Sequence, residues 1–179
     1  MRGLFAGALA LVAACTPTAA KPGIAFDDAT APSATSAEVT STSDAAAPRA
    51  RVRIVDAAED TDALSLVRSR RLEAKAEGRV LVVYVSATWC EPCKRLKAEL
   101  ESGRLDERLA NVTLLAFDAD RDTERLGAAG YSYRFVPFVA LPGPDGHPLD
   151  SQQATGKGGE AWRELLGKLD AWQRGAAPR

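Results

Sequence analysis

The stretch VLVVYVSATWCEPCK (residues 80–94) carries the strongest structural signal in this sequence of 179 residues. Its first six residues are apolar and mostly β-branched, which is typical of a strand buried on both faces of a sheet. Two cysteines follow, Cys90 and Cys93, with Glu91 and Pro92 between them. Proline is tolerated in the first turn of a helix, where an N–H would have no partner. The stretch therefore predicts a buried strand that leads directly into a helix beginning at the cysteines.

The position of the cysteine pair predicts which sulfur reacts first. Free N–H groups and the positive end of the helix dipole favour a thiolate at Cys90, so we expect Cys90 to attack a substrate disulfide. Cys93 lies one turn further into the helix, where we expect it to be shielded and to resolve the mixed disulfide. The carboxylate of Glu91 opposes thiolate formation at its neighbour, and it therefore favours a reducing over a strongly oxidising dithiol.

Two other interpretations of the pair involve no redox chemistry. A zinc site would need two further ligands, and apart from Cys15 the only other cysteine or histidine is His147. A permanently closed structural disulfide is the second interpretation, although a loop of two residues constrains the unfolded chain very little. A redox-active pair is therefore the favoured interpretation, and it requires neither a metal nor a bound cofactor.

Hydrophobic patterns on both sides of the motif predict one α/β domain over residues 51–172. The order of its elements, βαβαββα with an additional helix in front, predicts a central mixed sheet flanked by helices. Asp60 or Thr61 is expected to cap the first helix and Gly78 to end it, and residues 142–146 have the turn chemistry of a hairpin. The predicted strands are 51–55, 80–85, 112–117, 138–141 and 149–154, and the predicted helices are 61–77, 94–101, 123–129 and 160–172.

The composition and charge exclude some classes of partner. Apolar residues make up 46% of the chain and charged residues 26%, as in soluble globular proteins. The 23 Lys and Arg residues are balanced by 24 Asp and Glu, so the formal net charge is -1. This balance provides no basic surface that would attract nucleic acid. We therefore expect no nucleic-acid partner, and we expect the domain to be a monomer.

Residues 1–14 have the features of an export signal. A positively charged start precedes an apolar run that is too short to span a bilayer stably. Residues 12–15 resemble the lipobox of bacterial lipoproteins, in which cleavage before a cysteine makes that residue the lipidated first residue. The resemblance implies lipid on Cys15, and the alternative is an ordinary secretory signal cut near Ala14 or Ala20. In both cases the mature protein leaves the cytoplasm.

Residues 15–50 are predicted to be a disordered tether between the lipid and the domain. They are rich in Ala, Ser, Thr and Pro and contain too few bulky apolar residues to fold. A tether of this length has an end-to-end distance on the order of 30 Å. Thr16 stands where lipoproteins of enteric bacteria carry an Asp for inner-membrane retention, so the resemblance favours the outer membrane, with the domain facing the periplasm. Residues 173–179 are predicted to be a flexible tail.

Residues 87–94 (ATWCEPCK), together with Val136 and Pro137, resemble the thioredoxin family. The resemblance runs over residues 80–172. Within the family, residues 84–100, 118–121 and 138–146 look most like the C-terminal domain of the bacterial periplasmic thiol:disulfide interchange reductant. Thioredoxin-like lipoproteins of bacterial envelopes are the other close comparison. The resemblance implies a thioredoxin fold and thiol–disulfide oxidoreductase activity.

The resemblance also implies roles for four residues around the cysteines. It implies a cis peptide bond before Pro137, a Val136 backbone that pairs with an extended substrate, and a proline ring packed over the sulfurs. Without the resemblance, a trans proline at the start of an edge strand is the simpler interpretation. Trp89 and Pro92 complete the implied substrate surface, with Trp89 as an apolar platform beside Cys90, whereas composition alone equally allows a core tryptophan.

Two positions depart from the family pattern. Tyr84 stands six residues before Cys90, where thioredoxins have a buried Asp that assists proton transfer to the second cysteine. Ala116 falls near the position of the lysine that partners this Asp. The Tyr84 hydroxyl, Asp118 and Asp120 are alternative groups for proton transfer, although Tyr84 is more simply a packed strand residue.

Together these features predict an exported enzyme that reduces or exchanges protein disulfides. Cys90 and Cys93 carry the electrons, and an upstream membrane dithiol donor must reduce the pair again, because the compartment outside the inner membrane has no reducing thiol buffer. The alternatives are a disulfide oxidant or isomerase, and a non-catalytic module that binds peptides around Trp89 and Val136.

Overall fold

The computed structural model describes residues 51–175. Its strands are β1 (Arg53–Asp56), β2 (Val80–Ser86), β3 (Val112–Asp118), β4 (Phe138–Pro142) and β5 (Pro148–Gln153). Its helices are α1 (Ala63–Ala76), α2 (Glu91–Glu101), α3 (Asp106–Leu109), α4 (Ala119–Ala128), the 3₁₀ helix η1 (Ala161–Leu165) and α5 (Leu166–Gln173).

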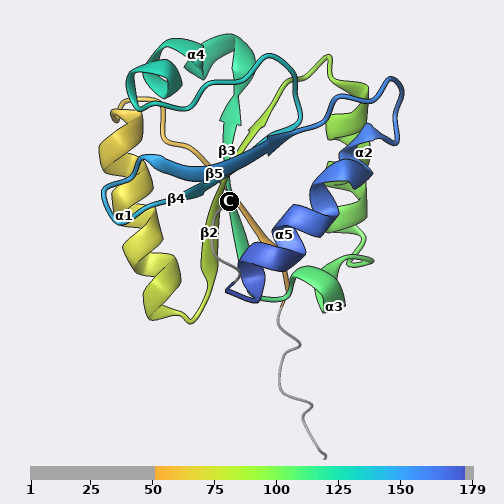
Figure 1. Ribbon diagram of the computed structural model, residues 1–179, viewed down its shortest axis with the longest axis horizontal. Coiled ribbons are helices and arrows are strands. Elements are labelled where there is room, and N and C mark those ends of the chain that lie inside the picture. The colour runs from red at the N-terminus through yellow and green to blue at the C-terminus, as the bar shows by residue number, and fades with distance from the viewer. Residues whose placement is uncertain (1–50, 176–179) are drawn as a thin grey trace, which may run out of the picture. The chain divides into compact units, whose positions relative to one another are not determined.

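The strands form one mixed sheet in the order β1-β3-β2-β4-β5 (Figure 1). The first three strands in this order are parallel to one another, because β3 pairs in parallel with both β1 and β2. Strand β4 is antiparallel to β2, and β5 is antiparallel to β4. This arrangement confirms the predicted α/β class, with a central mixed sheet flanked by helices.

Strand β2 lies in the middle of the sheet and is buried on both faces, as its sequence predicted. Val82 and Tyr84 belong to the hydrophobic cluster that includes residues of α2, α3 and α5. Val83 and Val85 belong to the cluster on the opposite face, which includes residues of α1 and α4. Figure 1 shows α1 and α4 on one side of the sheet and α2, α3 and α5 on the other. The alternation of side chains along β2 therefore joins two cores.

The carboxyl ends of the parallel strands position two of the helices. Ser86 at the end of β2 is in register with Asp118 at the end of β3. Helix α2 begins at Glu91, shortly after β2 ends, and α4 begins at Ala119, directly after β3. The cysteine pair therefore lies at the carboxyl edge of the parallel strands, as ligand and reaction sites of open α/β sheets commonly do.

Two helix starts differ from their prediction. Helix α1 is capped by Asp62, whose carboxylate accepts a hydrogen bond from the Ser65 N–H at 2.9 Å, and not by Asp60 or Thr61. Helix α4 begins four residues before the predicted Thr123, because Asp118 accepts from the Asp120 N–H at 2.8 Å. In both places several Asp and Thr side chains compete as caps, and only the folded backbone selects one of them.

The C-terminal helix also differs from the single helix predicted over 160–172. It is divided into the 3₁₀ helix η1 and the α-helix α5. Gly167 lies just after this change of geometry, and glycine has a low helix propensity. The four-residue helix α3 was not predicted, since a segment this short has no hydrophobic period to detect.

The predicted hairpin at 142–146 connects β4 and β5. The Gly143 N–H donates to the His147 carbonyl at 2.7 Å and closes the turn. Gly146 has a φ of +89°, and a Cβ there would lie 2.9 Å from the Leu64 carbonyl oxygen of α1. The turn therefore requires glycine both for its conformation and for its close approach to α1.

Several predictions concern residues outside the described part of the chain: the export signal (1–14), lipid on Cys15, the tether (15–50) and residues 176–179 of the tail. Helix α5 continues through Gln173, whose amide bonds the Asn111 N–H and the Arg108 carbonyl. Between residues 51 and 175, no helix has the length and apolar character needed to cross a bilayer.

Candidate functional site

Cys90 and Cys93 form a disulfide at the start of α2. The two sulfurs are 2.00 Å apart and the two Cα atoms 5.2 Å apart. Cys90 is the N-cap residue of the helix, and its sulfur accepts a hydrogen bond from the Cys93 N–H at 3.2 Å. Pro92 lies in the first turn, where its lack of an N–H costs nothing. The helix therefore begins at the cysteines, as predicted, and directs a free N–H at the Cys90 sulfur.

The expected contrast in exposure between the two cysteines is absent from the disulfide form. Each cysteine is only 3% exposed, although only Cys93 was predicted to be shielded. Ala87 is buried with the pair, and the half-buried side chains of Ala119 and Val136 pack against them. Cys90 is covered because segments that are far apart in the sequence pack over it. The spacing of residues within the motif could not predict this packing.

The segment before Pro137 lies against the disulfide. The Val136-Pro137 peptide bond is cis, as the family resemblance implied. Pro137 is buried, and the half-buried Val136 packs against the cysteine cluster. The Gln153 side chain accepts hydrogen bonds from the N–H groups of Arg134 and Phe135 at 2.9 and 3.2 Å, which ties this segment to the end of β5.

Two large aromatic side chains next to the site are exposed. Trp89, directly before Cys90, is 64% exposed, so it is not a core residue. Its ring N–H donates to both carboxylate oxygens of Asp120, at 3.1 and 2.9 Å, and Asp120 thus holds the indole in place. Phe135, directly before Val136, is 51% exposed and was not singled out from the sequence. Its position two residues before Pro137 was the sequence signal that could have identified it.

The charge of Glu91 is partly balanced by a neighbour. Arg95, one helical turn further on, pairs with Glu91 at 3.3 Å and with Glu160 at 2.9 Å. Hydrogen bonds to Glu160 and Glu91 raise the pKa of Arg95 above its ordinary value. The sequence-based inference that Glu91 favours a reducing dithiol left out Arg95, an exposed partner that partly offsets the charge of Glu91.

Tyr84 is a packed strand residue beside the site. It is 4% exposed, and its hydroxyl has no hydrogen-bond partner of ordinary geometry within residues 51–175. Burial raises the pKa of Tyr84 above its ordinary value, and the nearby Ser86 hydroxyl opposes this rise. The phenol is therefore neutral at physiological pH and is a poor proton acceptor.

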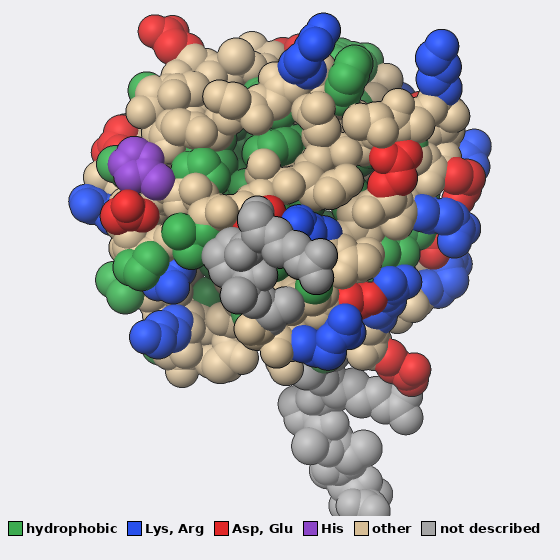
Figure 2. Space-filling view, in the orientation of Figure 1, with side chains coloured by type: hydrophobic (Ala, Val, Ile, Leu, Met, Phe, Trp, Pro, Cys, Tyr) green, Lys and Arg blue, Asp and Glu red, His purple; other side chains and the backbone are tan. Residues whose placement is uncertain are grey.

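The structure also places the possible metal ligands and the charged side chains of residues 51–175. Within the described part of the chain, no group of three or more His, Cys, Asp or Glu side chains is arranged to hold a metal ion. His147 instead lies at the hairpin, where its Nδ1 is 3.0 Å from the Ala129 carbonyl oxygen. On the face shown in Figure 2, basic and acidic side chains are interspersed.

The chain has similarities to known proteins. Residues 62–144 match a family model described as thioredoxin-like. The chain is similar to the oxidised thioredoxin of Plasmodium falciparum (21% identity, 67% of this chain and 99% of that chain covered, TM-score 0.42). It is also similar to a disulphide isomerase of Xylella fastidiosa (18% identity, 66% and 94% covered, TM-score 0.45). No curated protein matches the chain. The family match over residues 62–144, the sheet order and the cysteine pair at the start of α2 together support a thioredoxin-like family for this chain.

Proposed function

We propose that this protein is a thiol–disulfide oxidoreductase of the bacterial cell envelope that reduces or exchanges protein disulfides. The observation that carries the proposal is the Cys90–Cys93 disulfide at the N-terminus of α2, with the Cys93 N–H directed at the Cys90 sulfur. After reduction, the same N–H and the helix dipole stabilise a Cys90 thiolate. The pair is therefore arranged for nucleophilic attack by its first cysteine.

The reaction proceeds by two exchanges at sulfur. The Cys90 thiolate attacks one sulfur of a substrate disulfide, forms a mixed disulfide and releases the other substrate sulfur as a thiolate. Cys93 then loses its proton and attacks Cys90, which closes the Cys90–Cys93 disulfide and releases the second substrate thiolate. Two electrons pass from the cysteine pair to the substrate, so the reaction needs no metal or bound cofactor. An upstream dithiol at the membrane supplies two electrons to restore the pair.

The segment around Val136 is suited to hold an extended substrate chain. Within residues 51–175 neither the N–H nor the carbonyl of Val136 has a backbone partner, although its side chain lies against the cysteines. Free backbone groups can pair with an extended peptide in the manner of an added strand. Trp89 provides an exposed apolar surface beside Cys90, and Pro92 and Pro137 complete the proposed contact surface.

Catalysis of disulfide reduction tests the activity. The purified full chain, supplied with dithiothreitol, is expected to reduce a disulfide-bonded protein such as insulin well above the rate with dithiothreitol alone. The matched control is the double variant Cys90→Ser/Cys93→Ser, which keeps the surface and removes both sulfurs. Equal rates of reduction with the chain and with this control would exclude an oxidoreductase. The non-catalytic peptide-binding module would then be the remaining interpretation.

Lipid on Cys15 is the proposed membrane anchor, with residues 15–50 as the tether. Several acyl chains on one residue give durable anchoring, because each buried methylene contributes about 0.8 kcal/mol. In a bacterial host that lipidates exported proteins, the variant Cys15→Ala is expected to move from the membrane fraction to the soluble periplasmic fraction and to lose incorporation of labelled palmitate. Membrane association that survives this substitution would contradict the lipid anchor.

A further inference from the structure

A cavity of about 370 Å³ lies behind the disulfide, between α2 and the parallel strands. Cys93 and Lys94 contribute to its α2 side, and residues of β1, β2 and β3 form its floor. A space of this size holds several water molecules, since each occupies about 30 Å³ in the liquid. The resolving cysteine therefore borders a space through which a proton can leave.

One row of residues crosses the floor of this cavity. Tyr84 of β2 is in register with Ala116 of β3, which is in register with Asp56 of β1. All three line the cavity. The methyl group of Ala116 leaves the space between the other two side chains open, and Tyr84 is a neutral phenol. Asp56 is therefore the only residue of this row that can accept a proton near neutral pH.

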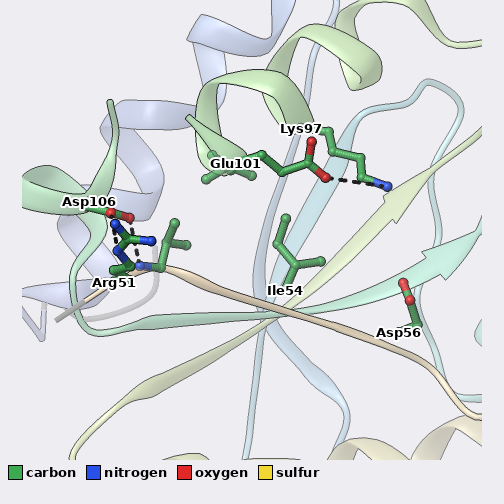
Figure 3. Close-up of a pocket in the computed structure, with 8 residues that line it drawn as sticks. Arg51, Ile54, Asp56, Lys97, Glu101 and Asp106 are labelled. Atoms are coloured by element: carbon green, nitrogen blue, oxygen red, sulfur yellow. Dashed lines mark hydrogen bonds and ion pairs between the residues drawn. The ribbon is translucent and has the colours of Figure 1, made fainter. Parts of the chain in front are cut away.

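Asp56 also lines a second cavity, of about 360 Å³ (Figure 3). Ile54, Asp56 and Lys97 border both cavities. Because Asp56 is exposed, it connects the space behind Cys93 with bulk solvent. A carboxylate at this junction can exchange protons on both sides.

The charged groups around Asp56 are mostly engaged with one another. In the second cavity Lys97 pairs with Glu101 at 3.8 Å and Arg51 pairs with Asp106 at 3.3 Å, while Asp56 stands apart from both pairs (Figure 3). Among residues 51–175, no ion pair or side-chain hydrogen bond involves the Asp56 carboxylate. Its oxygens are therefore free to bind water.

Two further charged groups face the cavity behind Cys93. Asp118 of β3 caps α4, and one of its oxygens accepts the Asp120 N–H at 2.8 Å. Lys94 of α2 is exposed and, as an ammonium ion, donates protons and does not accept them. Of the two carboxylates, Asp56 is the one with both oxygens available.

We propose that Asp56 is the proton acceptor for Cys93, acting through water in the cavity. The proposal rests on the proposed oxidoreductase function and concerns its second step. In that step the Cys93 S–H proton passes through water to the Asp56 carboxylate, the Cys93 sulfur bonds to Cys90, and the bond between Cys90 and the substrate sulfur breaks. The substrate leaves as a thiolate, and Asp56 then releases the proton to solvent. In the reverse direction Asp56 returns the proton to the departing Cys93 thiolate.

The two steps can be resolved with an aromatic disulfide, 5,5′-dithiobis(2-nitrobenzoate). In a Cys15→Ala background, which leaves only two cysteines, the reduced chain releases one coloured thiolate when Cys90 attacks and a second when Cys93 resolves the mixed disulfide. In stopped-flow measurements at about pH 7, Asp56→Asn is expected to slow the second release about tenfold and leave the first unchanged. The difference is expected to close at alkaline pH, where hydroxide removes the proton directly.

Two variants complete the experiment. Asp118→Asn is the matched control, because asparagine caps helices as well as aspartate does, and its second release is expected to stay within about twofold of the unsubstituted chain. Asp56→Glu keeps the carboxylate and is expected to restore most of the rate. An unchanged second release in Asp56→Asn, or a slow one in Asp118→Asn alone, would overturn the assignment. Failure of the unsubstituted chain to release a second thiolate would instead contradict the proposed function.

Discussion

Replacing Cys93 with Ser is expected to leave the protein covalently joined to its substrates. The Cys90 thiolate still attacks, because the α2 N-terminus that stabilises it is unchanged. Serine cannot resolve the mixed disulfide, so catalytic turnover falls to the background rate while the first exchange continues. Conjugates purified from cells that express Cys93→Ser are expected to appear as bands of higher mass on non-reducing gels. They should disappear on reduction, and mass spectrometry of the released partners identifies the substrates.

The corresponding single and double variants make this result specific. Cys90→Ser removes the attacking sulfur and is expected to lose both turnover and conjugates, and Cys90→Ser/Cys93→Ser reports background trapping. Equal amounts of conjugate from Cys93→Ser and from the double variant would contradict a reaction that begins at Cys90. Conjugates formed mainly by Cys90→Ser would reverse the roles of the two cysteines.

Replacing Leu114 with Ala is expected to lower the free energy of unfolding by about 2–5 kcal/mol. Leu114 is fully buried in β3 and belongs to the cluster formed with α2, α3 and α5. Its truncation removes buried methyl groups and leaves a cavity that a central strand cannot collapse to fill. Urea unfolding of the oxidised chain, followed by circular dichroism, measures the change.

Leu72 provides a control of identical chemistry at an exposed site. It lies on α1 with 65% of its surface exposed, so Leu72→Ala is expected to change the free energy of unfolding by no more than about 0.5 kcal/mol. Similar effects for the two substitutions would show that the cluster containing Leu114 is not the core of the fold.

Local sequence signals were sufficient for the centre of the fold. The β-branched run of β2 predicted a doubly buried strand because burial on both faces removes the usual alternation of polar residues. The spacing of Cys90 and Cys93, with Pro92 between them, predicted the start of α2 because caps and prolines act within a single helical turn. The cis peptide bond before Pro137 was predicted from family resemblance and not from local chemistry.

Local sequence signals could not predict the interactions between segments that are far apart in the sequence. The pairing of Arg95 with Glu91 is local, but its second partner, Glu160, is 65 residues away. The burial of Cys90 depends on Val136, which packs against the cysteines from a segment far along the chain. No sequence pattern distinguishes Asp56. Its place beside the cavity behind Cys93 follows only from the register of β1 with β3. The proposed proton acceptor of Cys93 and the residue that covers Cys90 could therefore be identified only from the folded structure.

The reduction potential of the Cys90–Cys93 pair tests the proposed reductive function most directly. The full chain is equilibrated with dithiothreitol or glutathione buffers of defined ratio, free thiols are alkylated, and the reduced and oxidised forms are counted by mass. We predict a potential near or below about -250 mV, at which the dithiol reduces ordinary protein disulfides. A potential near about -120 mV, typical of a strong oxidant, would contradict a reductase and assign the protein to disulfide formation.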